Sequence, residues 1–172
     1  KEASGSDRGS AYHRVLELLD YAGLADVLNE DIFKEENILK GENAFRKEKG
    51  FQGRDRLTAW YEAQLQGLIG AERITQQEAD LVNPKKIITF LQSPVAARMA
   101  KAAMRGDLYK EQPFVLGISA KTLSEEFPED ETVLIQGIID VYFVEDNEIV
   151  LLDYKTDAVA SGKELVQRYK TQ

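Results

Sequence analysis

The 172-residue sequence has no cysteine, a single histidine, and no run close to the roughly 20 apolar residues of a membrane-spanning helix. The missing cysteines exclude disulfides, zinc–thiolate sites and iron–sulfur clusters. They also favour an intracellular protein. No signal peptide is visible, since residues 1–9 are polar, and we expect these residues to form a linker or tail.

An excess of acidic residues gives the chain a formal net charge of −8 at pH 7. That sign is wrong for a domain that binds nucleic acid unaided, because the phosphate backbone is itself an anion. It is compatible with an enzyme whose carboxylates hold cations, and a neighbouring domain or subunit would then deliver the substrate. The length fits one domain that buries its core without cross-links.

Helical patterns occupy the first two thirds of the chain, and strand patterns follow them. Apolar periodicity and capping residues predict helices over 11–22, 57–69, 76–82, 84–92 and 94–104. The charged stretch 26–56 is expected to be an irregular or partly helical excursion. Strands are predicted over 108–120, 133–144 and 148–154, and a final helix over 162–172. This order predicts an α/β (α+β) fold in a single domain over 10–172. The last helical pattern reaches the final residue without a stop signal, which is typical of a polypeptide that continues.

Two carboxylates and a lysine lie in the last two strand patterns. Asp146-Asn147 between them is good hairpin-turn material, because both residue types tolerate positive φ. A turn symmetric about that pair places Asp140 opposite Asp153, with Lys155 on the same face. Directly opposed like charges destabilise a sheet, so a divalent cation is the natural partner. Three apolar side chains are expected to pack below the acids: Ile138, Ile149 and Leu151.

Oxygen ligands of this kind suit Mg²⁺ or Mn²⁺. Asp140 and Asp153 are the predicted ligands, and the backbone carbonyl of Tyr154 is a candidate for a third oxygen. Lys155 would orient or polarise the attacking water, or stabilise the charge that develops on the phosphate. An activated water, charge neutralisation and help for the leaving oxygen are what phosphodiester hydrolysis requires.

The Gly-Ile-Ile-Asp strand and the Asp-Tyr-Lys-Thr strand together resemble the PD-(D/E)XK nucleases of the RecB type. The resemblance is closest to the nuclease domain of the AddA (RexA) subunits of bacterial helicase–nucleases, and it covers about 10–22 and 57–172. The stretch 9–15 resembles the first motif of the family, which implies that His13 is a metal ligand. The stretch 109–114 resembles the Glu-x-Pro-Phe strand of the family.

That second match implies that Glu111 supports the site from its edge or holds a bridging water. Tyr169 and Gln172 resemble the start of the C-terminal motif, which implies that they contact the DNA backbone or the catalytic lysine. The resemblance also implies a restriction-endonuclease-like core, with a central mixed sheet, a catalytic hairpin and flanking helices.

The implied activity is Mg²⁺-dependent cleavage of single-stranded DNA that a helicase delivers, in double-strand-break repair and recombination in the bacterial cytoplasm. The implied partners are DNA, helicase domains of the same polypeptide and a second nuclease subunit, with no membrane. No G-x-x-x-x-G-K-[ST] motif occurs, so we expect no ATP site in this chain.

Other interpretations stay open. His13 borders an apolar stripe and can be a plain structural residue, while Asp140 and Asp153 can be a surface pair relieved by Lys155. Glu111, Tyr169 and Gln172 can be solvated surface residues. The alternative function is a catalytically degenerate module that guides DNA or docks a partner protein; a free-standing nuclease is a third interpretation. One metal ion or two, and the polarity of cleavage, also stay open.

Overall fold

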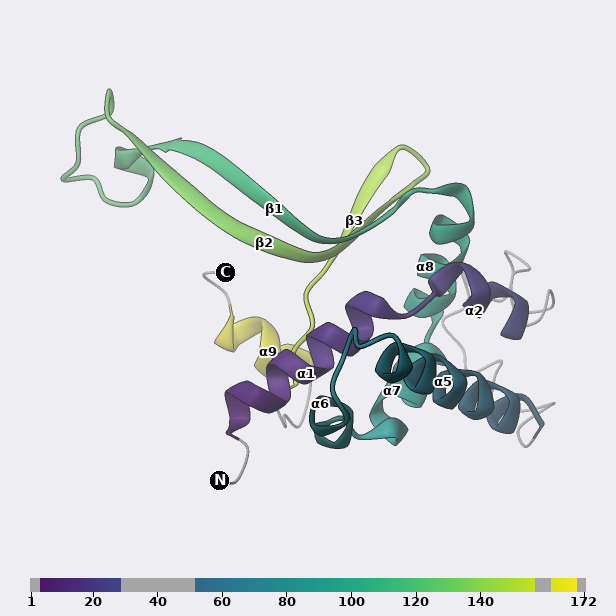
Figure 1. The fold of residues 1–172 in the computed structure, drawn as a ribbon. Coiled ribbons are helices and arrows are strands. Elements are labelled where there is room, and N and C mark those ends of the chain that lie inside the picture. The colour runs from purple at the N-terminus through teal and green to yellow at the C-terminus, as the bar shows by residue number, and fades with distance from the viewer. Residues whose placement is uncertain (1–3, 29–51, 157–161, 170–172) are drawn as a thin grey trace.

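The structure is a computed structural model, and it describes residues 4–28, 52–156 and 162–169 (Figure 1). Its helices are α1 (Gly5–Leu18), α2 (Tyr21–Val27), α5 (Gln52–Gly70), α6 (Gln76–Leu81), α7 (Pro84–Leu91), α8 (Pro94–Arg105) and α9 (Gly162–Arg168). Its strands are β1 (Leu108–Ser119), β2 (Thr132–Glu145) and β3 (Glu148–Leu152), and a short 3₁₀ turn, η1 (Ala120–Thr122), follows β1. None of the described helices is long and apolar enough to cross a bilayer.

Helix α1 begins at Gly5, whereas the sequence pattern predicted a start at Ala11. Ser4 and Asp7 form a reciprocal capping box, in which each side chain accepts the backbone N–H of the other residue. Residues 5–9 are therefore helical, and their assignment to a linker was wrong. The predicted single helix also breaks near Asp20, whose carboxylate accepts the backbone N–H of Gly23 and begins α2.

The other helix ends lie close to the predicted positions. The side chains of Thr75, Asn83 and Ser93 accept backbone N–H groups and cap α6, α7 and α8, as predicted. Helix α5 begins ahead of the predicted range, at Gln52. Most of the predicted excursion over 26–56, and the capping residue Ser161 before α9, lie outside the described residues.

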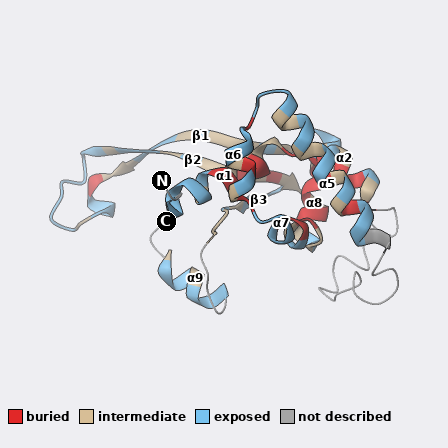
Figure 2. Ribbon diagram, turned by 60° about the horizontal axis from the view of Figure 1, so that its bottom comes forward, coloured by how far each residue is buried: buried red, intermediate tan, exposed pale blue. Residues whose placement is uncertain are grey.

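The helices build the hydrophobic core, and only the base of the sheet enters it. Figure 2 shows the buried core residues in the helical body, apart from a buried segment at the arm, where Ala120 of η1 lies. Val141 and Phe143 of β2 are fully buried against this cluster, so one face of β2 is fixed to the helices. The aromatic residue Tyr61 of α5 is fully buried as well.

The sheet is a three-stranded antiparallel meander in the order β1-β2-β3. Asp146 and Asn147 adopt φ values of 51° and 62° at the hairpin turn, as their sequence predicted. The register runs from Glu145 opposite Glu148 to Val141 opposite Leu152, which confirms the predicted pairing about that turn. The α+β class is confirmed. Within the described ranges the sheet is antiparallel throughout, so the prediction of a mixed sheet was wrong there.

The distal halves of β1 and β2 project from the helical body as a two-stranded arm (Figure 1). The loop at its tip carries the acidic stretch 125–131, which is exposed. Closer to the body, the three side chains expected below the acids are exposed instead: Ile138 63%, Ile149 70% and Leu151 61%. The acids therefore do not rest on a buried apolar layer formed by these residues.

Two glycine-to-alanine substitutions are predicted to have opposite effects on stability. Gly106 ends α8 with a φ of 80°, where a Cβ is strained although it meets no atom within 4 Å. Gly106→Ala should lower the free energy of unfolding by about 1 kcal/mol. Gly67 lies on the exposed side of α5, and Gly67→Ala should raise it by about 0.5–1 kcal/mol. Urea denaturation measures both; equal effects would contradict the left-handed cap.

Candidate active site

The main chain of Tyr154 joins the sheet to the first helix. Its N–H donates to Asp140 Oδ2 at 2.7 Å, and its carbonyl oxygen lies 3.0 Å from His13 Nε2. Its ring packs edge-on against His13 and Phe90, with centroids 5.8 and 5.7 Å apart. The phenol oxygen lies 3.4 Å from that of Tyr21. Tyr154 thus holds the imidazole and the carboxylate at fixed positions.

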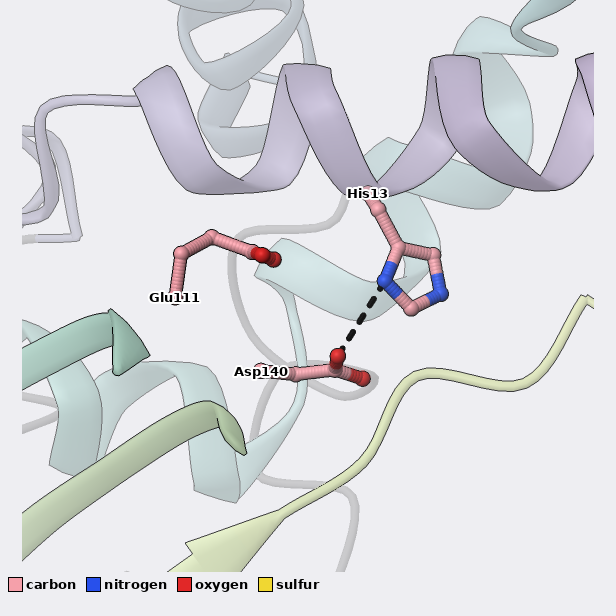
Figure 3. Close-up of side chains that lie close together, drawn as sticks. All are labelled: His13, Glu111 and Asp140. Atoms are coloured by element: carbon pink, nitrogen blue, oxygen red, sulfur yellow. Dashed lines mark ion pairs between the residues drawn. The ribbon is translucent and has the colours of Figure 1, made fainter. Parts of the chain in front are cut away.

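His13, Glu111 and Asp140 form a cluster in which each residue offers one ligand atom within 4.8 Å of the others. His13 projects from α1 toward the two carboxylates of the sheet, as Figure 3 shows. Its Nδ1 lies 3.2 Å from Asp140 Oδ1, and its Nε2 faces the carbonyl of Tyr154. Both partners are acceptors, so a neutral ring can donate to only one of them.

The lone pairs of His13 Nδ1 and Asp140 Oδ1 then face each other, and a hard divalent cation between them suits this arrangement. A cation between His13 Nδ1 and Asp140 would satisfy both atoms when Nε2 donates to Tyr154, and Glu111 would add a further oxygen. Mixed carboxylate and imidazole ligands suit Mn²⁺ and, with more oxygen, Mg²⁺. The donor set therefore fits the metal that the family resemblance implies, and the cluster is the candidate metal centre.

The backbone at Glu111 is bent out of regular strand geometry. Its φ is 48°, in the left-handed region that non-glycine residues rarely adopt. The pairs Lys110–Val141 and Gln112–Ile139 on either side place Glu111 opposite Asp140 on the next strand. Strain of this kind costs about 1–3 kcal/mol and gathers at functional sites.

Burial and nearby charge act on the acid–base groups of the site. Burial first, and then the carboxylates of Asp140 and Glu17, raise the pKa of Glu111 above its ordinary value. Burial raises the pKa of Tyr154 to about 12, so its phenol stays protonated at neutral pH. Glu111 is thus a carboxylate whose negative charge is poorly compensated by the protein alone.

An open depression beside α1 gives access to the cluster. Its volume is about 490 Å³, within the range of small-molecule sites, roughly 300–1,000 Å³. It is lined by Ser6, Gly9, Ser10, His13, Arg14, Glu17 and Glu111. The small residues of α1 leave the space, and Arg14, paired with Glu17 at 2.6 Å, brings a cation to the rim.

Lys155 and Asp153, the sequence neighbours of Tyr154, form a second group. Lys155 Nζ lies 2.7 Å from Asp153 Oδ2 and 4.5 Å from the centre of the Tyr169 ring. The lysine side chain is only 19% exposed, whereas that of Asp153 is 49% exposed. Tyr169, directly after α9, was expected to contact either the DNA backbone or the catalytic lysine, and here it contacts the lysine.

The structure brings together some of the predicted site residues and separates others. His13, Asp140 and Glu111 meet, and the carbonyl of Tyr154 lies beside them. Asp153 follows the end of β3, and among the described residues it does not join the three-residue cluster. The strand pairing ends at Val141–Leu152, one residue before Asp153, and the role of Asp153 as a metal ligand stays a prediction. Gln172 lies outside the described residues.

The sequence interpretation missed the residues that hold Tyr154. Tyr21 and Phe90 come from α2 and α7, far from Tyr154 in sequence, and contact its hydroxyl and its ring. Lys110 was also missed; its Nζ donates to the carbonyl of Leu19 and lies over the Tyr21 ring. The sequence signal available for Lys110 was its charge, in a strand pattern directly before Glu111.

The fold and the cluster define an α+β domain with a candidate site for a hard cation. No family model matches the chain. Curated relatives do, and their names describe the A subunit of an ATP-dependent helicase/nuclease. The relative from Lachnoclostridium phytofermentans is 30% identical over 100% of this chain and 13% of its own length. One from Clostridium kluyveri is 33% identical over 97% of this chain and 15% of its own length.

A relative of the same name from Clostridium botulinum strain Alaska E43 is 41% identical over 63% of this chain and 9% of its own length. The chain thus spans only a small segment of the curated relatives that it matches. The similarity over the whole chain supports the resemblance to the AddA proteins of helicase–nucleases.

Glu111→Gln is predicted to stabilise the metal-free protein at neutral pH. Because the folded-state pKa of Glu111 is raised, the folded protein keeps this proton to a higher pH than the unfolded chain does. Its ionisation therefore lowers stability as the pH rises through that range. The glutamine variant should have the higher free energy of unfolding at neutral pH, and the difference should shrink below the ordinary glutamate pKa of about 4.3.

Urea denaturation in the presence of a chelator, at neutral and at acidic pH, measures this difference. Glu62→Gln on the exposed surface of α5 is the matched control, and it should leave the stability unchanged. A Glu111→Gln protein that is less stable than the wild type at neutral pH would contradict the repulsive surroundings assigned to this carboxylate.

Proposed function

We propose that this chain is a metal-dependent deoxyribonuclease domain that hydrolyses phosphodiester bonds of single-stranded DNA. The observation that carries the proposal is the cluster of His13, Glu111 and Asp140, which the main chain of Tyr154 links to Lys155. The names of the relatives, which combine helicase and nuclease, support the same activity. We place the reaction in the repair of double-strand breaks and in recombination.

In this proposal the cation ligands, the main chain of Tyr154 and the Asp153–Lys155 pair each have a separate role at the scissile phosphate. His13, Asp140 and Glu111 hold the cation, which is Mg²⁺ in this proposal, with Mn²⁺ as a substitute. When bound, such a cation lowers the pKa of a water molecule and neutralises charge on the phosphate. In this arrangement the carbonyl of Tyr154 orients His13 by accepting from its Nε2–H, and Asp153 would join the cation only by leaving its contact with Lys155.

Lys155 is the proposed electrostatic catalyst. Its half-buried ammonium is held by Asp153 and by the ring of Tyr169, so few rotamers are open to it. A fixed cation next to the scissile phosphate stabilises the charge that develops on the phosphate oxygens in the transition state. It also orients the attacking water, and Glu111 is placed to accept a proton from that water.

The setting of the reaction is part of the proposal. The relatives are far longer than this chain, and their name includes a helicase. Helicase domains of the same polypeptide would deliver single strands, and a second nuclease subunit would work beside this one, in the bacterial cytoplasm. Such delivery would compensate for the acidic charge of this chain, which disfavours unaided capture of DNA.

A catalytically degenerate module that guides DNA or docks a partner protein is the second candidate. The position of Asp153 outside the three-residue cluster favours it, because the proposed metal centre then lacks one predicted ligand. Calorimetric titration with Mn²⁺ separates the two functions. The nuclease requires binding that disappears in Asp140→Ala, whereas the guiding module requires none.

Removal of the lysine should abolish cleavage without unfolding the domain. Lys155→Ala is expected to lower Mg²⁺-dependent cleavage of a single-stranded oligonucleotide by about a hundredfold or more, because a preorganised charge is lost. Lys121→Ala is the matched control, since that lysine lies in η1 and pairs with Glu129 in the arm. Gel analysis of a labelled oligonucleotide measures the rates. Wild-type cleavage in the Lys155→Ala protein would reject the assignment.

Loss of either strand carboxylate should have the same outcome. Asp140→Ala and Asp153→Ala are each predicted to reduce cleavage to background, the first through the cation and the second through the position of Lys155. Asp130→Ala, in the exposed loop of the arm, is the control and should cleave normally. If Asp153→Ala cleaves like the wild type, Asp153 is neither a ligand nor a support for the lysine.

A further inference from the structure

Two tyrosines stack across the sheet one step from the carboxylates. Tyr109 of β1 pairs directly with Tyr142 of β2, and their rings lie 4.6 Å apart at an angle of 13°. Leu151 of β3 pairs with Tyr142 from the other side. Paired residues point to the same face of a sheet, so these three side chains form one row, here named the aromatic row.

The aromatic row shares its face with the acidic residues. Side chains two residues apart in a strand point the same way, so Tyr142 lies on the face of Asp140, about 7 Å further along β2. On the opposite side of Asp140, two residues earlier in β2, is Ile138. The acidic position is therefore flanked on this face by an aromatic row and by an isoleucine.

The side chains that flank Asp140 on this face are open to solvent, whereas the Asp140 side chain is 11% exposed because His13 of α1 lies against it. Tyr109 is 38% exposed, Leu151 61% and Ile138 63%. The opposite face of the same strands carries Val141 and Phe143, which are fully buried in the helical core. Exposed apolar side chains that gather on one face, while the core occupies the other, are typical of a binding surface.

We infer that the aromatic row is a stacking platform for the bases of a single-stranded nucleic acid whose phosphate lies at Asp140. This inference rests on the proposed function and adds the residues that hold the bases. Tyr109 lies in the outer strand of the described sheet and is 38% exposed, so its ring is accessible to a base. Aromatic rings accept any base, because every base has a flat π-face.

The charges of the face decide against other occupants. An apolar protein surface laid over it would close off the cluster of two carboxylates and one imidazole without adding a compensating charge, which is costly. A duplex keeps its bases stacked inside and presents none to the tyrosines. A single strand offers a phosphate, which binds the cation that neutralises the carboxylates. It also offers free bases, which cover the exposed apolar side chains.

The test compares two ligands that differ only in their bases. One is a labelled oligothymidine of about 12 nucleotides, and the other is an abasic oligonucleotide of the same length and charge. Fluorescence anisotropy in Ca²⁺ measures the binding of each to the 172-residue chain. The wild type should bind the oligothymidine about tenfold more tightly, and Tyr109→Ala should bind both ligands equally.

Tyr109→Phe should keep the preference, because it keeps the ring, and Tyr109→Leu should lose it while preserving apolar bulk in the sheet. Phe127→Ala is the control, since that aromatic is 51% exposed but lies in the distant loop of the arm. A wild type without preference for bases would overturn the inference, as would equal losses in the alanine and phenylalanine variants. Cleavage in Mg²⁺ is scored separately, so the platform and the nuclease can fail independently.

Discussion

The two hydrogen bonds of the Tyr154 main chain are the constraint on which the whole site depends. They connect residues far apart in the chain, since His13 and Tyr154 are separated by 141 positions. One bond fixes the carboxylate of Asp140 and the other fixes the imidazole of His13. Together they set the distance of α1 from the end of β3. The positions of the metal ligands His13 and Asp140 therefore depend on how exactly the Tyr154 segment is held between α1 and the sheet.

The same segment connects the two chemical halves of the site. Asp153 and Lys155 are the sequence neighbours of Tyr154, so fixing Tyr154 also limits where their side chains can reach. The surrounding aromatic rings give the segment its rigidity, because Tyr154 packs against Phe90 and His13. An irregular segment beyond the end of a strand thus behaves like part of the fold, which suits residues that must meet a phosphate.

The site is assembled at the expense of local stability. Glu111 combines a left-handed backbone with repulsion from Asp140 and Glu17, and neither favours folding. The helical core offsets this cost, since Val141 and Phe143 anchor the C-terminal end of β2 directly beside Asp140. The preferences of residues for regular backbone and compensated charge are broken at the site, at Glu111, as is expected of functional residues.

That division explains how much of the molecule could be predicted from its sequence. The caps at Thr75, Asn83 and Ser93 and the turn at Asp146-Asn147 are decided by neighbouring residues, and all of them were predicted correctly. His13 and Glu111 were identified through the family resemblance, not through local pattern.

Other features depend on contacts that no local pattern encodes. The strand β3 ends at Leu152, and the N–H of Tyr154 then bonds to the side chain of Asp140 instead of a backbone carbonyl. The ladder pairing therefore stops one residue before Asp153, although the register up to Leu152 agrees with the prediction.

The acidic charge of the chain and its inferred single-strand binding are consistent for a physical reason. Phosphate contacts draw on counterion release and need many basic residues, whereas this chain has 30 acidic residues against 22 basic ones. Base stacking draws on apolar and aromatic surface, and it does not depend on net charge. Tyr109 and Tyr142 provide such surface next to carboxylates that a cation can neutralise. An acidic domain can then hold a strand at its site while leaving long-range attraction of DNA to other parts of the polypeptide.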